Sequence, residues 1–233
     1  MSRALIIVRA GETFADLRTR IGDFHDWIAE GLGLTCDVSH VDAREAPDLP
    51  EPASVAGVVV TGSHAMVSDR APWSEQLGQW LLRCVEARVP VLGICFGHQL
   101  LAHAIGGVVG YRADGRELGT IMVHQLEVGQ SDPLFQHMPQ VFPAHVVHEQ
   151  SVLALPPGAV RLAWSSQEPC QAFRFGDCAW GVQFHPEFSA TAIQAYQARL
   201  APGAYPEDAP DTPEAARLLR LFAEYVLRRG NAG

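Results

Sequence analysis

The sequence contains no lysine: all 17 basic residues among its 233 are arginine. Without lysine the chain cannot form a Schiff base, supply a P-loop lysine or build a serine–lysine amidase pair. The 26 acidic residues outnumber the arginines and give a formal net charge of -9. A nucleic acid would be repelled by that charge, so we expect no nucleic-acid partner.

Long apolar runs are also missing. The longest, such as Val55–Val60, have the length of a strand and are far shorter than a membrane span. The N-terminal stretch Ala4–Val8 is too short for a signal peptide and predicts a first strand. We therefore expect a cytoplasmic protein with no membrane partner.

Motifs that bind metals or form redox pairs are absent too. The ten histidines contain no H-E-x-x-H motif, and there is no C-x-x-C pair among the five cysteines, which are Cys36, Cys84, Cys95, Cys170 and Cys178. The sequence thus predicts no metal, no cofactor and free thiols. Four of the thiols are expected to be small buried hydrophobes, which leaves one for chemistry.

Strands and helices are expected to alternate in the first half. Continuous apolar runs predict strands at Ala4–Val8, Cys36–Val41, Val55–Thr61 and Val89–Ile94. Helical spacing predicts helices from Phe14 to Leu32, over Trp73–Arg88 and over Gln99–Ile105, with a loop at Pro47–Pro52. This order predicts an α/β fold with a doubly wound, mostly parallel, flavodoxin-like sheet.

The second half has a different pattern, with short β-like segments joined by turns. They are Val108–Tyr111, Gly119–Val128, Ala144–His148, Ala159–Trp164, Gln171–Phe175 and Trp180–Phe184, and we expect them to add antiparallel strands to the sheet. A helix at Ala190–Leu200 and a loop at Pro202–Pro213 follow. A last helix is expected to start at Pro213 with Thr212 as its cap. No repeat or linker divides the chain, so we predict a single domain over residues 1–233.

The segment around Cys95 carries the strongest functional signal. Gly93, Cys95 and Gly97 form G-x-C-x-G at the junction of a predicted strand and a predicted helix. A side chain held in such a sharp turn is lifted above the sheet edge, and the helix N-terminus favours a thiolate there. A small apolar residue in an ordinary turn would also fit the motif, but the strand before it and the helix after it favour a nucleophile.

A general base for this thiol is expected at His185. Glu187 lies two residues further on, and in an extended segment both side chains point the same way. The carboxylate is then expected to orient the imidazole, as in a catalytic triad. By itself, H-P-E is better explained by a histidine at a strand end beside a surface glutamate; the cysteine elbow upstream reverses this preference and favours the triad.

Acyl transfer also requires amide donors for an oxyanion. The Phe96 amide, at the start of the predicted helix, is one candidate. Gly62 follows the third strand and is the other, although an ordinary turn glycine explains it equally well.

Two segments together resemble the class I glutamine amidotransferases: Gly93–Gln99 and Gly181–Phe188. The resemblance implies that Cys95 is the nucleophile, His185 the acid and base, and Glu187 the orienting residue. It also implies that Gly62 completes an oxyanion hole and that Gln99 shapes the substrate pocket. The segment that starts with His148 and Glu149 resembles the one that holds the α-amino and α-carboxylate groups of the substrate.

The resemblance implies glutamine or another γ-glutamyl compound as substrate, hydrolysed through a thioester. Thr61-Gly62-Ser63 and Glu149-Gln150 depart from the family's usual G-G-P and G-D, and the first is more like stand-alone members similar to the amidotransferase half of GMP synthase. Ammonia would then serve an acceptor enzyme on a separate chain. A γ-glutamyl peptide hydrolase with the same triad is the alternative. Relatives of the fold with other functions, or a binding module, are disfavoured because H-P-E is present.

Overall fold

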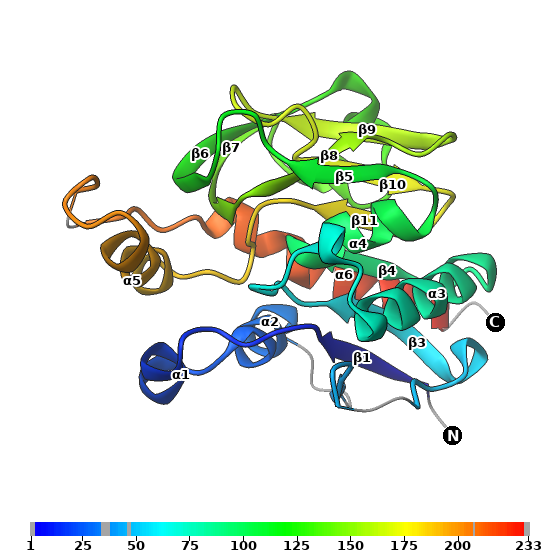
Figure 1. Cartoon of the computed structure of the whole chain (residues 1–233). Coiled ribbons are helices and arrows are strands. Elements are labelled where there is room, and N and C mark those ends of the chain that lie inside the picture. Colours follow the sequence, from blue (N-terminus) through cyan, green and yellow to red (C-terminus); the bar gives the residue numbers. More distant parts are fainter. Residues whose placement is uncertain (1–2, 34–37, 46–47, 207, 231–233) are drawn as a thin grey trace.

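The structure, a computed structural model, describes residues 3–33, 38–45, 48–206 and 208–230. A nine-stranded sheet runs through it in the order β2-β1-β3-β4-β11-β10-β9-β6-β7, and β5 and β8 form a separate pair (Figure 1). The strands are β1 (Ala4–Arg9), β2 (Val38–Asp42), β3 (Val55–Val60), β4 (Val91–Ile94), β5 (Val108–Tyr111), β6 (Glu117–Gln125), β7 (Val141–His148), β8 (Gln150–Ala154), β9 (Ala159–Trp164), β10 (Ala172–Phe175) and β11 (Ala179–Val182). The helices are α1 (Ala15–Ile21), α2 (Phe24–Leu32), α3 (Pro72–Glu86), α4 (Phe96–Ala104), α5 (Ala190–Leu200) and α6 (Pro213–Gly230).

Five neighbouring strands of the large sheet, β2, β1, β3, β4 and β11, are parallel. From β10 onward each strand is antiparallel to its neighbour. The predicted fold class, a doubly wound sheet with antiparallel additions in the C-terminal half, is confirmed.

Helices cover both faces of the parallel strands. On one face α2 and α6 bury Ile28, Leu218 and Phe222 against the sheet, and on the other α3 and α4 bury Leu81 and Leu100. The strands β1, β3, β4 and β11 are mostly buried and have no polar side, which is why their sequences are nearly continuous apolar runs, whereas the edge strand β2 is partly exposed.

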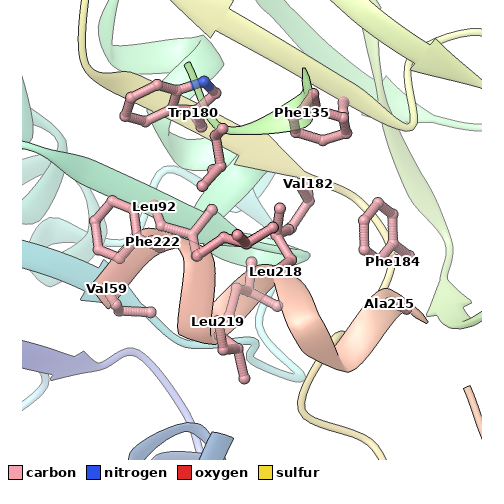
Figure 2. Packing of buried hydrophobic residues seen from close by; sticks show 14 of the residues in the cluster. Val59, Leu92, Phe135, Trp180, Val182, Phe184, Ala215, Leu218, Leu219 and Phe222 are labelled. Carbon is pink, nitrogen blue, oxygen red and sulfur yellow. The ribbon is translucent and has the colours of Figure 1, made fainter. Parts of the chain in front are cut away.

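The C-terminal helix α6 lies against the middle of the sheet. Figure 2 shows Leu218 and Phe222 of this helix facing Leu92 and Val182 of the two central strands. All four side chains are fully shielded from solvent. Among the residues that the structure describes, no helix is both long and apolar enough to cross a bilayer.

The central pair of strands, β4 and β11, positions the ends of two distant segments. They are parallel, with Ile94 beside Val182. Because parallel strands end at the same sheet edge, Cys95 after β4 and the segment after β11 emerge side by side. The antiparallel pairing predicted for β11 is present on the side of β10, but on its other side β11 pairs in parallel with β4, which was not predicted.

The single helix expected from Phe14 to Leu32 was also wrong, since two helices cover this stretch. Gly22 has a φ of 88°, and Asp23 accepts a hydrogen bond from the Phe24 amide in a capping box that starts α2. The apolar residues keep a spacing of three and four through the break, so the pattern alone did not show it.

Several boundaries also differ. The strand β8 was missed because it follows β7 after one residue, Glu149, with no turn signal between them. The Thr212 hydroxyl is buried and has no hydrogen-bond partner in the described part of the chain, so its predicted capping role was wrong. Residues 36–37, 47 and 207, at the edge of one expected strand and in two expected loops, lie outside the described residues.

Candidate active site

Cys95 occupies a strained turn between β4 and α4. Its φ is 50° and ψ is -100°, outside the regions that non-glycine residues favour. A side chain on Gly93 would overlap the Gly97 carbonyl, and one on Gly97 would come within 2.6 Å of the Val60 carbonyl oxygen. Both glycines are therefore required where the elbow packs on the sheet. The Cys95 amide donates to the Val182 carbonyl at 2.9 Å, which fixes the elbow to β11.

His185 lies just past the end of β11 and is held at both ends. Its amide donates to the His145 carbonyl at 2.8 Å, and its Nδ1 lies 2.8 Å from a Glu187 carboxylate oxygen. Both side chains are almost fully buried. The expected contact is present, but Pro186 and Glu187 form a turn and not the extended segment on which the expectation was based.

The charges around His185 favour its protonated form. Burial acts against protonation, but the negative charges of Glu187 and Cys95 outweigh it and raise the pKa of His185 to about 10. Its Nε2 is buried and makes no hydrogen bond within the described residues, so this nitrogen is available on the side away from Glu187. The ring also stacks on Phe188, with centroids 4.1 Å apart. The imidazole is therefore held in one orientation, almost fully shielded from water, in surroundings that favour its protonated form.

The other described cysteines have no such partner. Burial raises the pKa of Cys84 and of Cys170 to about 12, and it also raises that of Cys178. These three are inert buried thiols, and Cys36 lies outside the described residues. Of the four described thiols, only Cys95 lies beside a histidine–carboxylate pair.

A cavity of about 290 Å³ opens onto this pair. Its lining residues are Phe14, Phe24, Ser63, His64, Ala65, Met66, Cys95, Phe96, Gln99, Arg116, Val147, His148, Glu149, His185, Tyr196 and Leu200. The volume is near the lower end for ligand pockets, so a small substrate fits it best. Among the described residues, no group of three or more side chains could hold a metal ion.

The three residues expected to bind substrate all line this cavity, but they differ in their partners. The Gln99 side-chain amide donates to the Gln150 carbonyl at 2.7 Å and to Gln183 Oε1 at 2.9 Å. Glu149 is partly exposed and forms an ion pair with Arg116, whose Nε lies 2.9 Å away. Gln99 thus braces the start of β8, whereas Glu149 presents charge to the cavity.

His148 is buried and bonded on both ring nitrogens. Nδ1 lies 2.9 Å from the Gln150 carbonyl oxygen, and Nε2 lies 2.7 Å from Glu117 Oε2. Arg112 lies 3.0 Å from Glu168 and 3.7 Å from Glu117, so two buried carboxylates share one guanidinium. With no ring nitrogen free for a ligand, His148 holds the backbone at 148–150.

Both candidate oxyanion donors lie near the thiol. Phe96 is the first residue of α4, so its amide has no acceptor within the helix. A side chain at Gly62 would come within 3.1 Å of His185 Cε1 and 3.9 Å of Cys95 Cβ. Gly62 thus leaves room for the catalytic ring, and the oxyanion role of both residues stays a prediction.

Sequence reasoning missed Arg116 and the aromatic side of the cavity. Phe14 directly precedes α1 and Phe24 starts α2, whereas Tyr196 and Leu200 lie on α5, far away in the chain. The sequence predicted that all four residues lie in helices, and nothing local in the sequence indicates that they border a cavity. Arg116 belongs to no motif, and its sequence neighbours predict no contact with substrate.

The family described as glutamine amidotransferase class-I matches residues 24–198 of the chain. The chain belongs to this family. The resemblance found in the sequence is thus confirmed at the level of the family.

Curated relatives of this family member include GMP synthases described as glutamine-hydrolysing. The chain is 39% identical over 140 residues to the enzyme of Thermomicrobium roseum, a match that covers 60% of the chain but only 25% of that protein. It is 30% identical over 145 residues to a glutamine-hydrolysing GMP synthase subunit from Methanococcus aeolicus, covering 62% of the chain and 71% of the relative. The chain thus spans about a quarter of the full-length synthase but most of the separate subunit.

Solved structures show the same fold. A glutamine amidotransferase from Methylobacillus flagellatus has a TM-score of 0.69 at 25% identity, over 100% of this chain and 95% of that one. A glutamine amidotransferase from Thermotoga maritima has a TM-score of 0.69 at 21% identity, over 100% and 94% of the two chains.

Proposed function

We propose that this protein hydrolyses the side-chain amide of glutamine, or another γ-glutamyl amide, through a thioester on Cys95. The observation that carries the proposal is the convergence of Cys95 and the His185–Glu187 pair at the adjacent ends of β4 and β11, on one cavity. Family membership supports glutamine as the amide donor.

The reaction follows from the positions of these groups. The Cys95 sulfur attacks the γ-carbonyl carbon, and the oxygen becomes an oxyanion held by amides at Phe96 and Gly62. When the carbon–nitrogen bond breaks, His185 gives its proton to the departing amine. Water then attacks the thioester with His185 as base, which releases glutamate and restores the thiol.

The polar end of the cavity suits the α-amino acid part of the substrate. Arg116 would bind the α-carboxylate and Glu149 the α-ammonium group, because their charges are complementary to this zwitterion. Gln99 and His148 hold the backbone next to Glu149 in place, since both side chains form hydrogen bonds with the Gln150 carbonyl.

The fate of the ammonia is a separate part of the proposal. The relatives that are single subunits of GMP synthase suggest an acceptor enzyme on another chain. An alternative is a γ-glutamyl peptide hydrolase, in which the leaving group is an amine and no acceptor is needed.

The test uses the purified full chain with glutamine, measuring glutamate and ammonia together. We expect equal amounts of both, loss of activity in Cys95→Ser and in His185→Ala, and covalent labelling of Cys95 by a glutamine-like electrophile. A wild-type protein that hydrolyses no γ-glutamyl amide, or activity that survives Cys95→Ser, would exclude this mechanism.

A further inference from the structure

One side of the cavity is lined by apolar and aromatic groups that the hydrolysis of free glutamine does not require. Phe14, Phe24, Tyr196 and Leu200 form this wall, which we call the aromatic wall. Ammonia, the leaving group of glutamine, offers no apolar surface to such a wall. An apolar substituent on the amide nitrogen would provide a surface that packs against the wall.

The aromatic wall is rigidly built. The rings of Phe14 and Tyr196 have centroids 4.9 Å apart. The Tyr196 hydroxyl lies 3.0 Å from both Thr13 Oγ1 and His64 Nε2, so its polar end is satisfied within the protein. The remaining ring surface is therefore held in one orientation beside the cavity.

The wall also reaches the catalytic base. Phe24 packs near His185, with ring centroids 6.4 Å apart and planes 28° from parallel. The apolar surface thus begins next to the residue that gives its proton to the leaving group. A group attached to the departing nitrogen would meet this wall first.

The polar and apolar linings come from different elements. Arg116 and Glu149 lie at the start of β6 and between β7 and β8, whereas the aromatic wall comes from the segment before α1, from α2 and from α5. A γ-glutamyl group with its charged end at Arg116 and its carbonyl at Cys95 would direct the amide nitrogen away from the polar lining.

We propose that the site favours γ-glutamyl amides whose nitrogen carries a small apolar or aromatic group over glutamine itself. This inference rests on the proposed thioester hydrolysis and adds the class of leaving group, a primary amine. His185 gives its proton to that amine as the carbon–nitrogen bond breaks, and water resolves the thioester as before. The cavity of about 290 Å³ limits the substituent to roughly one ring or a short alkyl chain.

The test compares kcat/KM for glutamine with that for its γ-N-methyl, γ-N-propyl and γ-N-benzyl amides. Alkylamines are similar leaving groups, so differences within the series report contact with the substituent. We expect kcat/KM to rise by about three- to fourfold for each methylene that the wall buries. The γ-N-(2-hydroxyethyl) amide is the uncharged polar control, because the Arg199 guanidinium lies 4.2 Å from the Phe14 ring and would attract a carboxylate. It is similar in size to the propylamide and should be poorer, because its hydroxyl would be placed against apolar side chains.

Two variants test whether the preference for apolar substituents comes from the aromatic wall. Leu200→Ala and Phe14→Leu should each lower the ratio of kcat/KM for the benzylamide to that for glutamine. Leu227→Ala removes an exposed leucine on α6, away from the cavity, and should leave the ratio unchanged. Thermal unfolding midpoints of all three proteins report whether any of them is misfolded.

The outcomes separate the two claims. If glutamine is hydrolysed as well as the benzylamide or better, or if Leu200→Ala and Phe14→Leu leave the ratio unchanged, the preference for apolar substituents is wrong and the proposed function stands. If no γ-glutamyl amide is hydrolysed, both fail.

Discussion

Glu187 controls the protonation of His185 and makes no direct contact with the thiol in the proposed reaction. Its charge is one of the causes that raise the pKa of His185 to about 10. Glu187→Gln keeps the shape and a hydrogen-bond acceptor but removes that charge, so the pKa of His185 should fall. The imidazolium is then lost at lower pH, and the alkaline limb of the kcat/KM profile should move to lower pH.

The control for this experiment is Glu224→Gln, which removes an exposed charge on α6. It should leave the pH profile unchanged. Glu187→Ala should lower kcat less than His185→Ala or Cys95→Ala, since Glu187 orients the base but does not bond to the substrate. An alkaline limb that stays in place in Glu187→Gln would contradict the role assigned to its charge.

A substitution at Gly62 tests how closely the His185 ring is packed. A methyl group there would lie 3.1 Å from His185 Cε1, closer than ordinary contact, and no strained backbone angle is involved. Gly62→Ala should therefore displace the ring by a few tenths of an ångström and lower kcat by about tenfold. The matched control is Gly78→Ala in α3, where the methyl would have only ordinary contacts. Equal kcat in both variants and the wild type would show that the ring tolerates the displacement.

At the residue scale, the sequence predicted the groups that carry chemistry better than those that surround the substrate. Cys95 stands in a motif whose two glycines the strained turn requires, and His185 stands two residues before its carboxylate partner. Arg116 and Phe14 have no such motif. They reach the cavity only because β6 and the segment before α1 meet there in the folded chain, and a single sequence does not show that meeting.

Asp23 caps the start of α2 and also holds the chain next to Phe14, which lines the cavity. Its carboxylate accepts hydrogen bonds at 2.8 Å from the amides of Thr13 and Phe24, so it starts α2 and holds the residue before Phe14. Asp23→Ala should lower the free energy of unfolding by about 1–2 kcal/mol through loss of the cap. Chemical denaturation measures this. Asp16→Ala, which removes an exposed ion pair with Arg199, should change it by less than about 0.5 kcal/mol, and equal effects would argue against the cap.

At the element scale, the spacing of apolar residues located the strands and helices but did not show which strands lie next to one another in the sheet. The helix Ala190–Leu200 and the strand Val108–Tyr111 have the predicted bounds. The antiparallel pairing of β11 with β10 was expected from the short turn between them. The parallel pairing of β11 with β4 was missed because strand order is a tertiary property. That pairing is nevertheless what brings His185 to Cys95.

On the scale of the whole molecule, the pH dependence of stability is expected to come in part from histidines that are neutral when buried in the folded protein. Burial lowers the pKa of His98 to about 3 and that of His145 to about 4. In the unfolded chain a histidine binds a proton below about pH 6.5. Between these values the unfolded state holds more protons, so each histidine contributes stability above pH 6.5 that is lost as pH falls. His185 acts in the opposite sense, because its raised pKa gives stability below pH 6.5 that is lost as pH rises toward 10.

We therefore expect the free energy of unfolding to fall between pH 6.5 and 4.5, above the range in which most carboxylates titrate. A fully buried neutral histidine contributes a slope of up to about 1.4 kcal/mol per pH unit in this window. His98→Asn should remove the contribution of His98 to this slope, even if the substitution also changes the free energy of unfolding at pH 7. His137 is exposed, and His137→Asn should leave the slope unchanged. Urea denaturation at several pH values measures the slope. An unchanged slope in His98→Asn would mean that His98 takes up a proton in the folded protein, which its complete burial against Phe173 opposes.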